Sequence, residues 1–301
     1  MLLAGGALRV VVASPAGAGR AQETAQALVE RALANQHRND AALAEYERLE
    51  RRRVRKDGSV AEDKTRRVVP TGTGTLRLVV EENGRPVAAD FYRKQLRDLE
   101  QALVWALNPQ ESKQRQRVEK WEKRKKERAS SVDAVREAFL ITPLGESATC
   151  PERSRRAAGP GGRRQVRIQL DPNPAFKPRT RTAELFPYVR ATLWVDQASG
   201  QLERLEAESI RDISIGGGLL GKIYRGGRFV IEQREAAPGV WLPTLYQTDI
   251  TGRRFLFSFE LHESTEVRNY VHIGPPQEAL AAVRRELASP QASAPESSLR
   301  K

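Results

Sequence analysis

Hydrophobic and polar residues alternate along much of the second half of the chain. Residues 191–208, ATLWVDQASGQLERLEAE, alternate as far as Asp196, pass through a turn at Gln197–Gly200, and alternate again from Leu202. Such a pattern is typical of an antiparallel hairpin with one buried face. That face needs an apolar cover, which is either the protein's own core or a ligand.

The same alternation recurs in a series of segments separated by short turn signals. The segments expected to form strands are 165–170, 188–196, 202–214, 222–235, 240–251 and 253–271. In the last segment, Phe255, Phe257, Phe259 and Leu261 fall on one face. The sequence therefore predicts an antiparallel meander over this half of the chain.

The first half mixes helical and strand patterns. Residues 22–36 carry apolar residues at the spacing of one helix face, namely Ala25, Leu28, Val29, Ala32 and Leu33. The runs 44–55 and 59–69 predict two strands joined by a turn at Lys56-Asp57-Gly58. A third strand is expected at 76–80, before the Asn83-Gly84 reversal.

Two further helices are expected in the middle of the chain. Residues 88–107 repeat apolar side chains at helical intervals, at Phe91, Leu96, Leu99, Leu103 and Leu107. Residues 110–140 predict a highly charged helix that contains Trp121. Because this second helix has little apolar surface, it either projects from the body or lies across it through its long Lys and Arg stems.

These elements indicate an α+β fold in one domain. The domain is expected over residues 22–276, with a helical insertion at 89–140 and an Arg/Gly/Pro loop at 150–164. Residues 277–301 predict a short helix followed by a Ser/Pro-rich disordered tail. Residues 1–21 are apolar and small with an Ala16-Gly17-Ala18 cleavage pattern, so an export signal is expected, although Arg9 interrupts it and a plain flexible terminus is the alternative.

The formal charge of +13 is concentrated in two stretches. Residues 111–128 hold nine Lys/Arg against four Glu, and residues 150–181 hold nine against two acidic residues. The basic helix is compatible with a solvated surface, with contact to anionic lipid or envelope polymer, or with nucleic acid. Nucleic acid is the least favoured partner, because neither regular aromatic interleaving nor a ribonucleoprotein signature accompanies the charge.

Candidate catalytic and metal-binding patterns are weak. Cys150 is the single cysteine, which excludes a cysteine metal cluster. His37, His262 and His272 lack partners at ligand spacing, and no hydrolase motif is present. Glu206 and Glu208 share one side of a strand, as solvated residues usually do. We therefore expect a protein that is not an enzyme and that needs no metal or cofactor.

One glycine-rich segment has the outline of a phosphate-binding loop. Gly216 to Lys222 reads GGGLLGK, but Ile223 follows where a Ser or Thr should ligate magnesium. The continuation also has the pattern of a strand instead of a helix. A turn between strands is the favoured interpretation.

Residues 176–243 resemble a known group. The blocks FKPRTRTAELFPYVRATLWVDQASGQLERLEAE, GGGLLGKIYRGGRFVIEQ and VWLPTLYQTDI are similar to bacterial envelope proteins described as outer-membrane lipoprotein-sorting proteins. These look like members of the periplasmic lipoprotein-carrier superfamily. YERLERRRVRKDGSVAEDKTRRV and ENGRPV extend the resemblance to about residues 22–272, apart from 150–164.

The resemblance implies an open, curved antiparallel β half-barrel, with covering helices and a hydrophobic cavity for acyl chains. The family pattern carries no catalytic residues, so cavity-lining positions follow from alternation alone. The expected lining residues, each of which otherwise belongs to ordinary core, are Leu193, Val195, Val230, Trp241, Phe255, Phe257, Phe259 and Leu261.

The function implied is non-enzymatic binding of an acyl lipid or a lipoprotein in the periplasm or otherwise outside the cytoplasm, in sorting or transport. Two alternatives remain. In the first, the protein is an envelope scaffold or sensor that uses the same sheet to bind a protein partner, with the basic helix as a docking arm. In the second, the chain is a basic nucleic-acid-binding protein. The departure from the carrier pattern is the charged insertion at 89–140.

Overall fold

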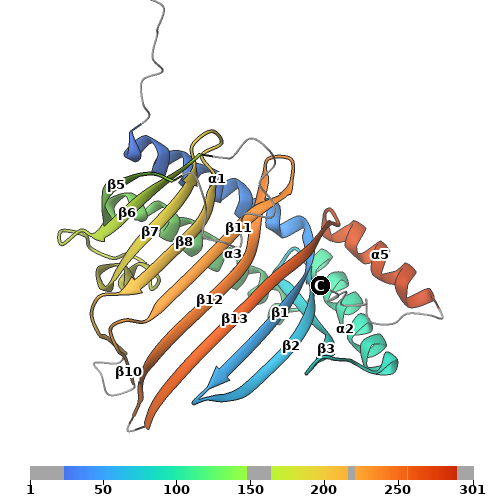
Figure 1. Cartoon of the computed structure of the whole chain (residues 1–301). Helices are drawn as coiled ribbons and strands as arrows, with labels where there is room; N and C mark the ends of the chain where they lie inside the picture. The colour runs from blue at the N-terminus through green and yellow to red at the C-terminus, as the bar shows by residue number, and fades with distance from the viewer. Residues whose placement is uncertain (1–23, 148–163, 216–220, 256, 290–301) are drawn as a thin grey trace, which may run out of the picture.

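The computed structural model describes residues 24–147, 164–215, 221–255 and 257–289. Within them, 13 strands form one antiparallel sheet that does not close, in the order β4-β3-β2-β1-β13-β12-β11-β8-β7-β6-β5, with β10 paired to β12 and β9 (Figure 1). The expected signal segment, the tail beyond residue 289, and nearly all of the loop 150–164 and of the GGGLLGK segment lie outside the described residues.

The strands have the following bounds: β1 Tyr46–Lys56, β2 Ser59–Pro70, β3 Thr75–Glu82, β4 Arg85–Pro86, β5 Phe139–Ser147, β6 Gln165–Pro172, β7 Val189–Asp196, β8 Leu202–Ser209, β9 Ile213–Ile215, β10 Gly221–Ile223, β11 Arg228–Ala237, β12 Val240–Arg254 and β13 Phe257–His272. The α-helices are α1 Ala25–Ala42, α2 Ala89–Leu107, α3 Ser112–Asp133, α4 Val135–Ala138 and α5 Pro276–Ala288. Short 3₁₀ turns cover Leu43–Glu45 and Ala183–Tyr188.

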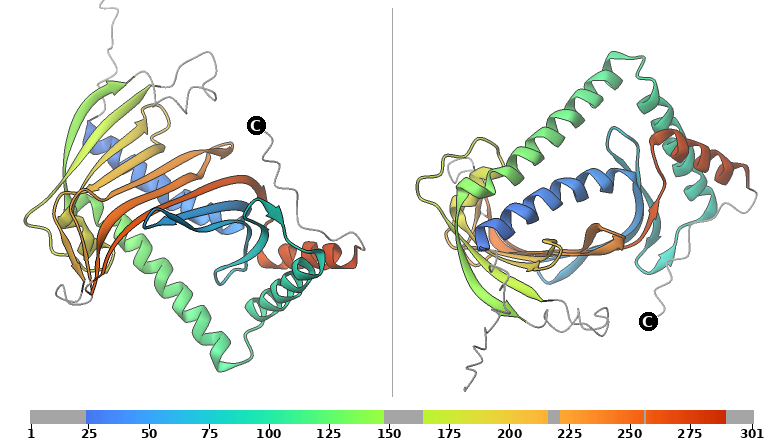
Figure 2. Two further views of the ribbon diagram at one scale, coloured as in Figure 1. Left: turned by 60° about the horizontal axis from the view of Figure 1, so that its bottom comes forward. Right: turned by 90° about the horizontal axis from the view of Figure 1, so that it is seen from above.

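The two halves of the chain meet where β1 pairs with β13. Arg52 lies opposite Thr265, and Lys56 lies opposite Leu261. This pairing joins the amino-terminal hairpins to the meander in a single curved sheet. Figure 2 shows α1 inside the curve of the sheet, whereas α2 and α5 lie outside it beside β1–β3.

Helix α1 packs on the concave face over β5–β8. Thr24 caps it by accepting a hydrogen bond from the Ala27 amide at 3.1 Å, and Leu28 and Val29 are almost fully buried. They share one core with Leu193 and Val195 of β7. The apolar face of the β7–β8 hairpin is therefore covered by the protein's own helix.

A second core lies on the opposite face of β1–β3, under α2 and α5. Its helix residues from α2 are Tyr92, Leu96, Leu99 and Leu103, which are inaccessible to solvent. Phe91, which the sequence pattern groups with these leucines, is instead 49% exposed, and Tyr92 is buried beside them. The stripe still has the 3.6-residue period that the sequence predicts.

A buried polar cluster holds α5 and α2 to the sheet. The Arg67 guanidinium donates to both carboxylate oxygens of Glu47 at 2.8 Å, to Tyr92 at 2.8 Å and to Glu286 at 2.7 Å. Burial raises the pKa of Tyr92 to about 12. Because the four residues come from β2, β1, α2 and α5, one guanidinium fixes the position of four elements.

The charged helix is shorter than expected. Helix α3 ends at Asp133, the four-residue α4 follows, and β5 begins at Phe139, so the predicted helix to residue 140 is wrong at its carboxyl end. The insertion expected at 89–140 accordingly includes the first two residues of an edge strand. Helix α3 crosses the open side of the molecule between α2 and β5 (Figure 2). Arg128 anchors it to α1 through Asp40, at 2.7 and 2.8 Å.

The strand boundaries differ from the sequence expectation at three places. The run 202–214 forms β8 and β9, and the run 222–235 forms β10 and β11. Gly252 does not end a strand, because β12 continues to Arg254 and Gly252 lies opposite Phe259. Phe255 leaves the strand with a φ of 54°, in the left-handed region. The reversal therefore comes three residues later than the glycine suggests.

Candidate functional site

Beyond α1, the concave face carries an apolar strip along β11, β12 and β13. Its members are Phe229, Ile231, Ile250, Phe259 and Leu261. The strand register places them on one face, since Ile231 lies opposite Leu205, Phe229 opposite Ala207 and Ile250 opposite Leu261. Leu205 and Ala207 pack at the margin of the α1 core, which identifies the face as the concave one. Phe229 remains 38% exposed.

The strip is packed closely at its far end. Gly252 lies under Phe259, and a Cβ at residue 252 would be 3.0 Å from the phenyl ring and 2.3 Å from the Lys222 carbonyl oxygen. A glycine is therefore required for β10 and the Phe259 ring to approach β12 together. The close contact with Gly252 holds the Phe259 ring against β12, on the face that carries the apolar strip.

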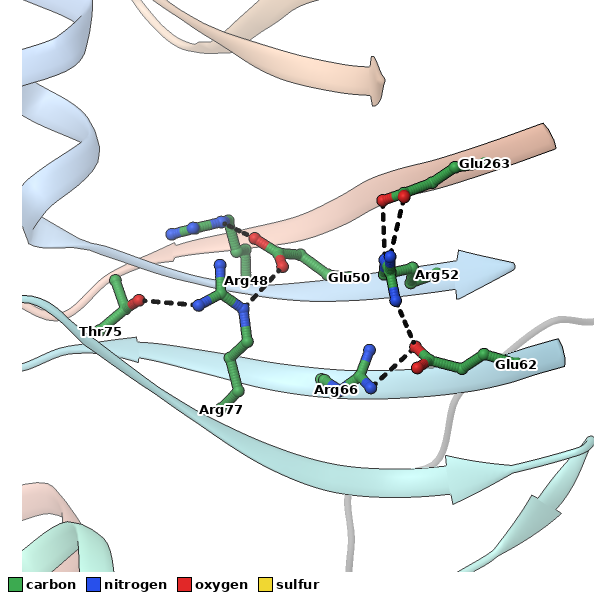
Figure 3. Close-up of polar contacts among 8 residues, drawn as sticks. All are labelled: Arg48, Glu50, Arg52, Glu62, Arg66, Thr75, Arg77 and Glu263. Atoms are coloured by element: carbon green, nitrogen blue, oxygen red, sulfur yellow. Dashed lines mark hydrogen bonds and ion pairs between the residues drawn. The ribbon is translucent and has the colours of Figure 1, made fainter. Parts of the chain in front are cut away.

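Next to the apolar strip, the same face of β13, β1, β2 and β3 is charged. The charged strip consists of Arg48, Glu50, Arg52, Glu62, Arg66, Arg77 and Glu263 (Figure 3). The two strips meet on β13, where Leu261 and Glu263 lie two residues apart on one face. The concave surface is therefore amphiphilic, with hydrocarbon on one side and guanidinium and carboxylate groups on the other.

Arg52 is the centre of one half of the charged strip. It donates to both oxygens of Glu263, at 2.7 and 2.8 Å, and lies 3.2 Å from Glu62, which also accepts a hydrogen bond from Arg66 at 2.8 Å. The hydrogen bonds with Glu263 raise the pKa of Arg52 despite its partial burial. Burial opposes ionisation of Glu62, yet the two guanidinium groups hold its pKa below the ordinary value. Arg52 and Glu62 therefore both carry their charge at neutral pH.

The other half of the strip ends in an unsatisfied donor. Arg48 donates to Glu50 at 2.9 Å, and Glu50 also accepts from Arg77 at 3.4 Å. The Arg48 side chain is only 9% exposed, and its Nη1 is buried without a hydrogen-bond partner among the described residues. A buried donor left unpaired costs about 1–3 kcal/mol. Arg48 is therefore a donor that an oxygen of a bound group would satisfy.

Two tyrosines lie beside Arg48 on this face. Burial raises the pKa of Tyr246, and the positive charges of Arg128 and Arg48 offset part of this effect. Burial also raises the pKa of Tyr270, which donates its hydroxyl proton to the Pro243 carbonyl at 2.5 Å. Both phenols therefore stay neutral at physiological pH, and neither supplies a phenolate.

The eight expected lining residues do not form one surface. Leu193 and Val195 lie in the α1 core, and Trp241 is buried near α1, with its backbone amide donating to Asn39. Val230 is buried on the opposite face of β11 from Phe229, opposite Glu206. Phe259 and Leu261 belong to the apolar strip, Phe257 continues it outward at 79% exposure, and Phe255 lies in the turn at 54% exposure.

Sequence reasoning missed Phe229, Ile231 and Ile250. The alternation of Phe229 and Ile231 with Arg228 and Val230 was a usable signal, but it does not say which face is concave. The charged strip was also missed, because its residues come from strands that are far apart in the sequence. Only the turn at Asp57-Gly58 pointed to the β1–β2 part of it.

The three histidines and Glu206 are engaged in ion pairs at the surface. His262 contacts Asp249 and Glu260, each at 2.9 Å, on the face opposite the apolar strip. Glu206 pairs with Arg204, and lies 3.5 Å from Arg228. Across the described ranges, no group of three His, Cys, Asp or Glu residues is placed to hold a metal ion.

Comparison with protein-family models and with curated protein sequences finds no match to this chain. Among the helices that the structure describes, none is both long and apolar enough to cross a membrane.

Proposed function

We propose that this protein is a non-enzymatic binding protein for an amphiphilic acyl lipid or the lipid part of a lipoprotein, acting in the bacterial cell envelope. The observation that carries the proposal is the contact between the apolar and charged strips on the concave face. In this proposal, the open, curved sheet of the protein is a lipoprotein-carrier-like half-barrel. The chain is exported and takes part in sorting or transport of the lipid or lipoprotein.

The apolar strip offers a surface for hydrocarbon. Its five side chains come from three adjacent strands, and burial of an acyl chain contributes about 0.8 kcal/mol per methylene group. Exposed apolar residues in one contiguous area are typical of a binding surface. The acyl chain lies on this strip in the proposed complex, and Phe257 extends the surface toward the end of the β12–β13 hairpin.

The charged strip offers donors for the polar head of the same molecule. Most of its guanidinium groups are already paired with carboxylates, so a head group competes with internal ion pairs instead of meeting free charge. Arg48 is itself paired with Glu50 through Nε, but its Nη1 has no partner within the described residues. A head-group oxygen bound there satisfies a buried donor of the charged strip.

Native mass spectrometry with lipid extraction tests the proposal. The chain is produced in the periplasm of a bacterial host, and the mass of its mature amino terminus is measured in the same run. Stoichiometric acyl-containing mass supports lipid binding. An empty protein from this host, together with no binding of added phospholipid, contradicts the proposal.

A matched pair of variants on one strand places the lipid. Ile250→Arg introduces a charge into the apolar strip, whereas Thr251→Arg introduces the same charge at an exposed position on the opposite face of β12. We expect Ile250→Arg to remove the bound lipid and Thr251→Arg to retain it. Equal loading of both variants would contradict the assignment to the concave face.

A further inference from the structure

A pocket of about 290 Å³ lies outside both strips, between the β2–β3 turn, the end of α2 and the first half of α3. We infer that this pocket binds the phosphate group of an alkyl phosphate or a similar phosphomonoester amphiphile. The inference does not depend on the proposed function, because none of the lining residues belongs to the apolar strip or to the charged strip.

The polar wall of the pocket carries positive charge without acidic residues. Arg117, Lys120 and Arg124 of α3 line it at the spacing of one helix face. None of the three forms a hydrogen bond or an ion pair with another described residue. Elsewhere on α3, Arg128 is paired with Asp40. Three unpaired cations at one opening create a local field that attracts an anion.

Three threonines line the pocket together with these cations. Thr71, Thr73 and Thr75 line it from the β2–β3 turn. The Thr75 hydroxyl accepts a hydrogen bond from Arg77 at 3.3 Å, so its own proton is available for an anion (Figure 3). A phosphate group has several acceptor oxygens and matches donors that arrive from several directions, and arginine pairs with it bidentately.

The turn that carries the threonines is held in place. The Thr71 amide donates to the Gly74 carbonyl at 3.0 Å, which closes the turn. Gly72 has a φ of 76°, and a Cβ there would be 2.5 Å from Cγ of Pro276 at the start of α5. The turn is therefore packed against α5, and the hydroxyl donors are positioned before a ligand arrives.

Apart from Gln114, the remaining side chains of the wall are apolar, which is why the ligand is an amphiphile and not a bare ion. They are those of Leu76, Ala102, Trp105, Ala106 and Val118. Trp105 is 37% exposed although it is a large apolar side chain. Liquid water occupies about 30 Å³ per molecule. The pocket of about 290 Å³ therefore corresponds to about ten water-sized groups, whereas a phosphate group has five heavy atoms, so room is left for an alkyl segment against Trp105.

Isothermal titration calorimetry with two probes, inorganic phosphate and octyl phosphate below its micelle concentration, tests the inference. Arg117→Ala/Arg124→Ala removes two lining cations, and Lys123→Ala/Lys126→Ala removes two cations of α3 that do not line the pocket. We expect octyl phosphate to bind more tightly than phosphate. The first variant weakens this binding about tenfold or more, and the second leaves it nearly unchanged.

A third variant separates the two sources of phosphate. Ala102→Leu places a larger side chain at the apolar wall. If the alkyl segment lies there, this variant weakens the binding of octyl phosphate and leaves the binding of inorganic phosphate unchanged. Equal binding of both probes that is lost in Arg117→Ala/Arg124→Ala overturns the assignment of an amphiphile, because the anion site then binds free phosphate. Absence of binding, or equal weakening by the two double variants, overturns the inference. Ile250→Arg leaves octyl phosphate binding intact here, whatever it does to lipid loading.

Discussion

Arg52 and Glu263 are separated by 211 positions in the sequence, yet the guanidinium donates two hydrogen bonds to the carboxylate, at 2.7 and 2.8 Å. This pair links β1 to β13 on the concave face, at the seam that joins the two halves of the sheet. Both side chains are about one-third exposed, at 36% and 30%, so water screens part of the attraction.

The first prediction concerns this pair. Glu263→Ala is expected to lower the free energy of unfolding by about 1 kcal/mol, because Arg52 keeps its contact with Glu62 and remains partly hydrated. Urea unfolding of Glu263→Ala, Arg52→Ala and the double variant measures the coupling. Strict additivity of the two single effects would show that the pair contributes nothing to the seam.

The second prediction concerns the polar cluster under α5. Arg67→Met is expected to cost about 3 kcal/mol of unfolding free energy, because Glu47 and Glu286 are left partly buried and without the guanidinium that they contact. Chemical denaturation measures the loss. Arg53→Met is the control, since Arg53 is 48% exposed and lies 3.7 Å from Glu266. A loss for Arg67→Met no larger than that of the control would contradict the anchoring role.

Local chemistry explains which parts of the fold were predictable. Asp57-Gly58 closes the β1–β2 hairpin as its sequence indicates, and the helical period at Leu96, Leu99 and Leu103 gives α2 its buried face. Both patterns can be read from neighbouring residues in the sequence. The pairing of β1 with β13 joins segments that are more than 200 residues apart, so no local pattern predicts it.

The candidate site was less predictable for a related reason. Alternation shows that Val230 and Phe229 lie on different faces of β11, but only the packing of α1 decides which face is concave. In β12 an irregularity in the pairing with β11, between Pro243 and Leu245, changes which positions share a face. Trp241 and Tyr246 therefore lie on one face in spite of their odd separation, which strict alternation excludes.

The third prediction concerns the titration of His262. Its hydrogen bond with Asp249, and to a smaller extent that with Glu260, raises the pKa of His262 above the ordinary value of 6.5. Nuclear magnetic resonance titration of the ring protons is expected to give a midpoint above 6.5, and Asp249→Asn is expected to lower it more than Glu260→Gln does. An unchanged midpoint in Asp249→Asn would contradict the pairing.

The sign of the linked stability effect follows from that direction. A histidine whose pKa is raised in the folded state stabilises the fold fully below its unfolded pKa, and loses this contribution as the pH rises through its folded pKa. The difference in unfolding free energy between the parent protein and Asp249→Asn should therefore shrink as the pH rises from the unfolded pKa of His262 through its folded pKa. The effect is small, because the His262 side chain is 47% exposed.

The last prediction uses the exposed end of the apolar strip. Phe257→Arg should leave the free energy of unfolding nearly unchanged, because Phe257 is 79% exposed. If an acyl chain covers this ring, loss of its burial weakens lipid binding by about tenfold or more. Val60→Arg is the matched control, since Val60 is 66% exposed and its partner Arg55 lies on the other face, opposite His262.

Lipid retained by each variant after purification is measured by mass spectrometry, alongside urea unfolding. Loss of lipid in Phe257→Arg with an unchanged unfolding midpoint places hydrocarbon at the outer end of the strip. Full retention in Phe257→Arg combined with loss in Ile250→Arg confines the lipid to the inner part, nearer α1. Retention in both variants removes the apolar strip as the binding surface, since a charge introduced at either position would disturb an acyl chain buried on the strip.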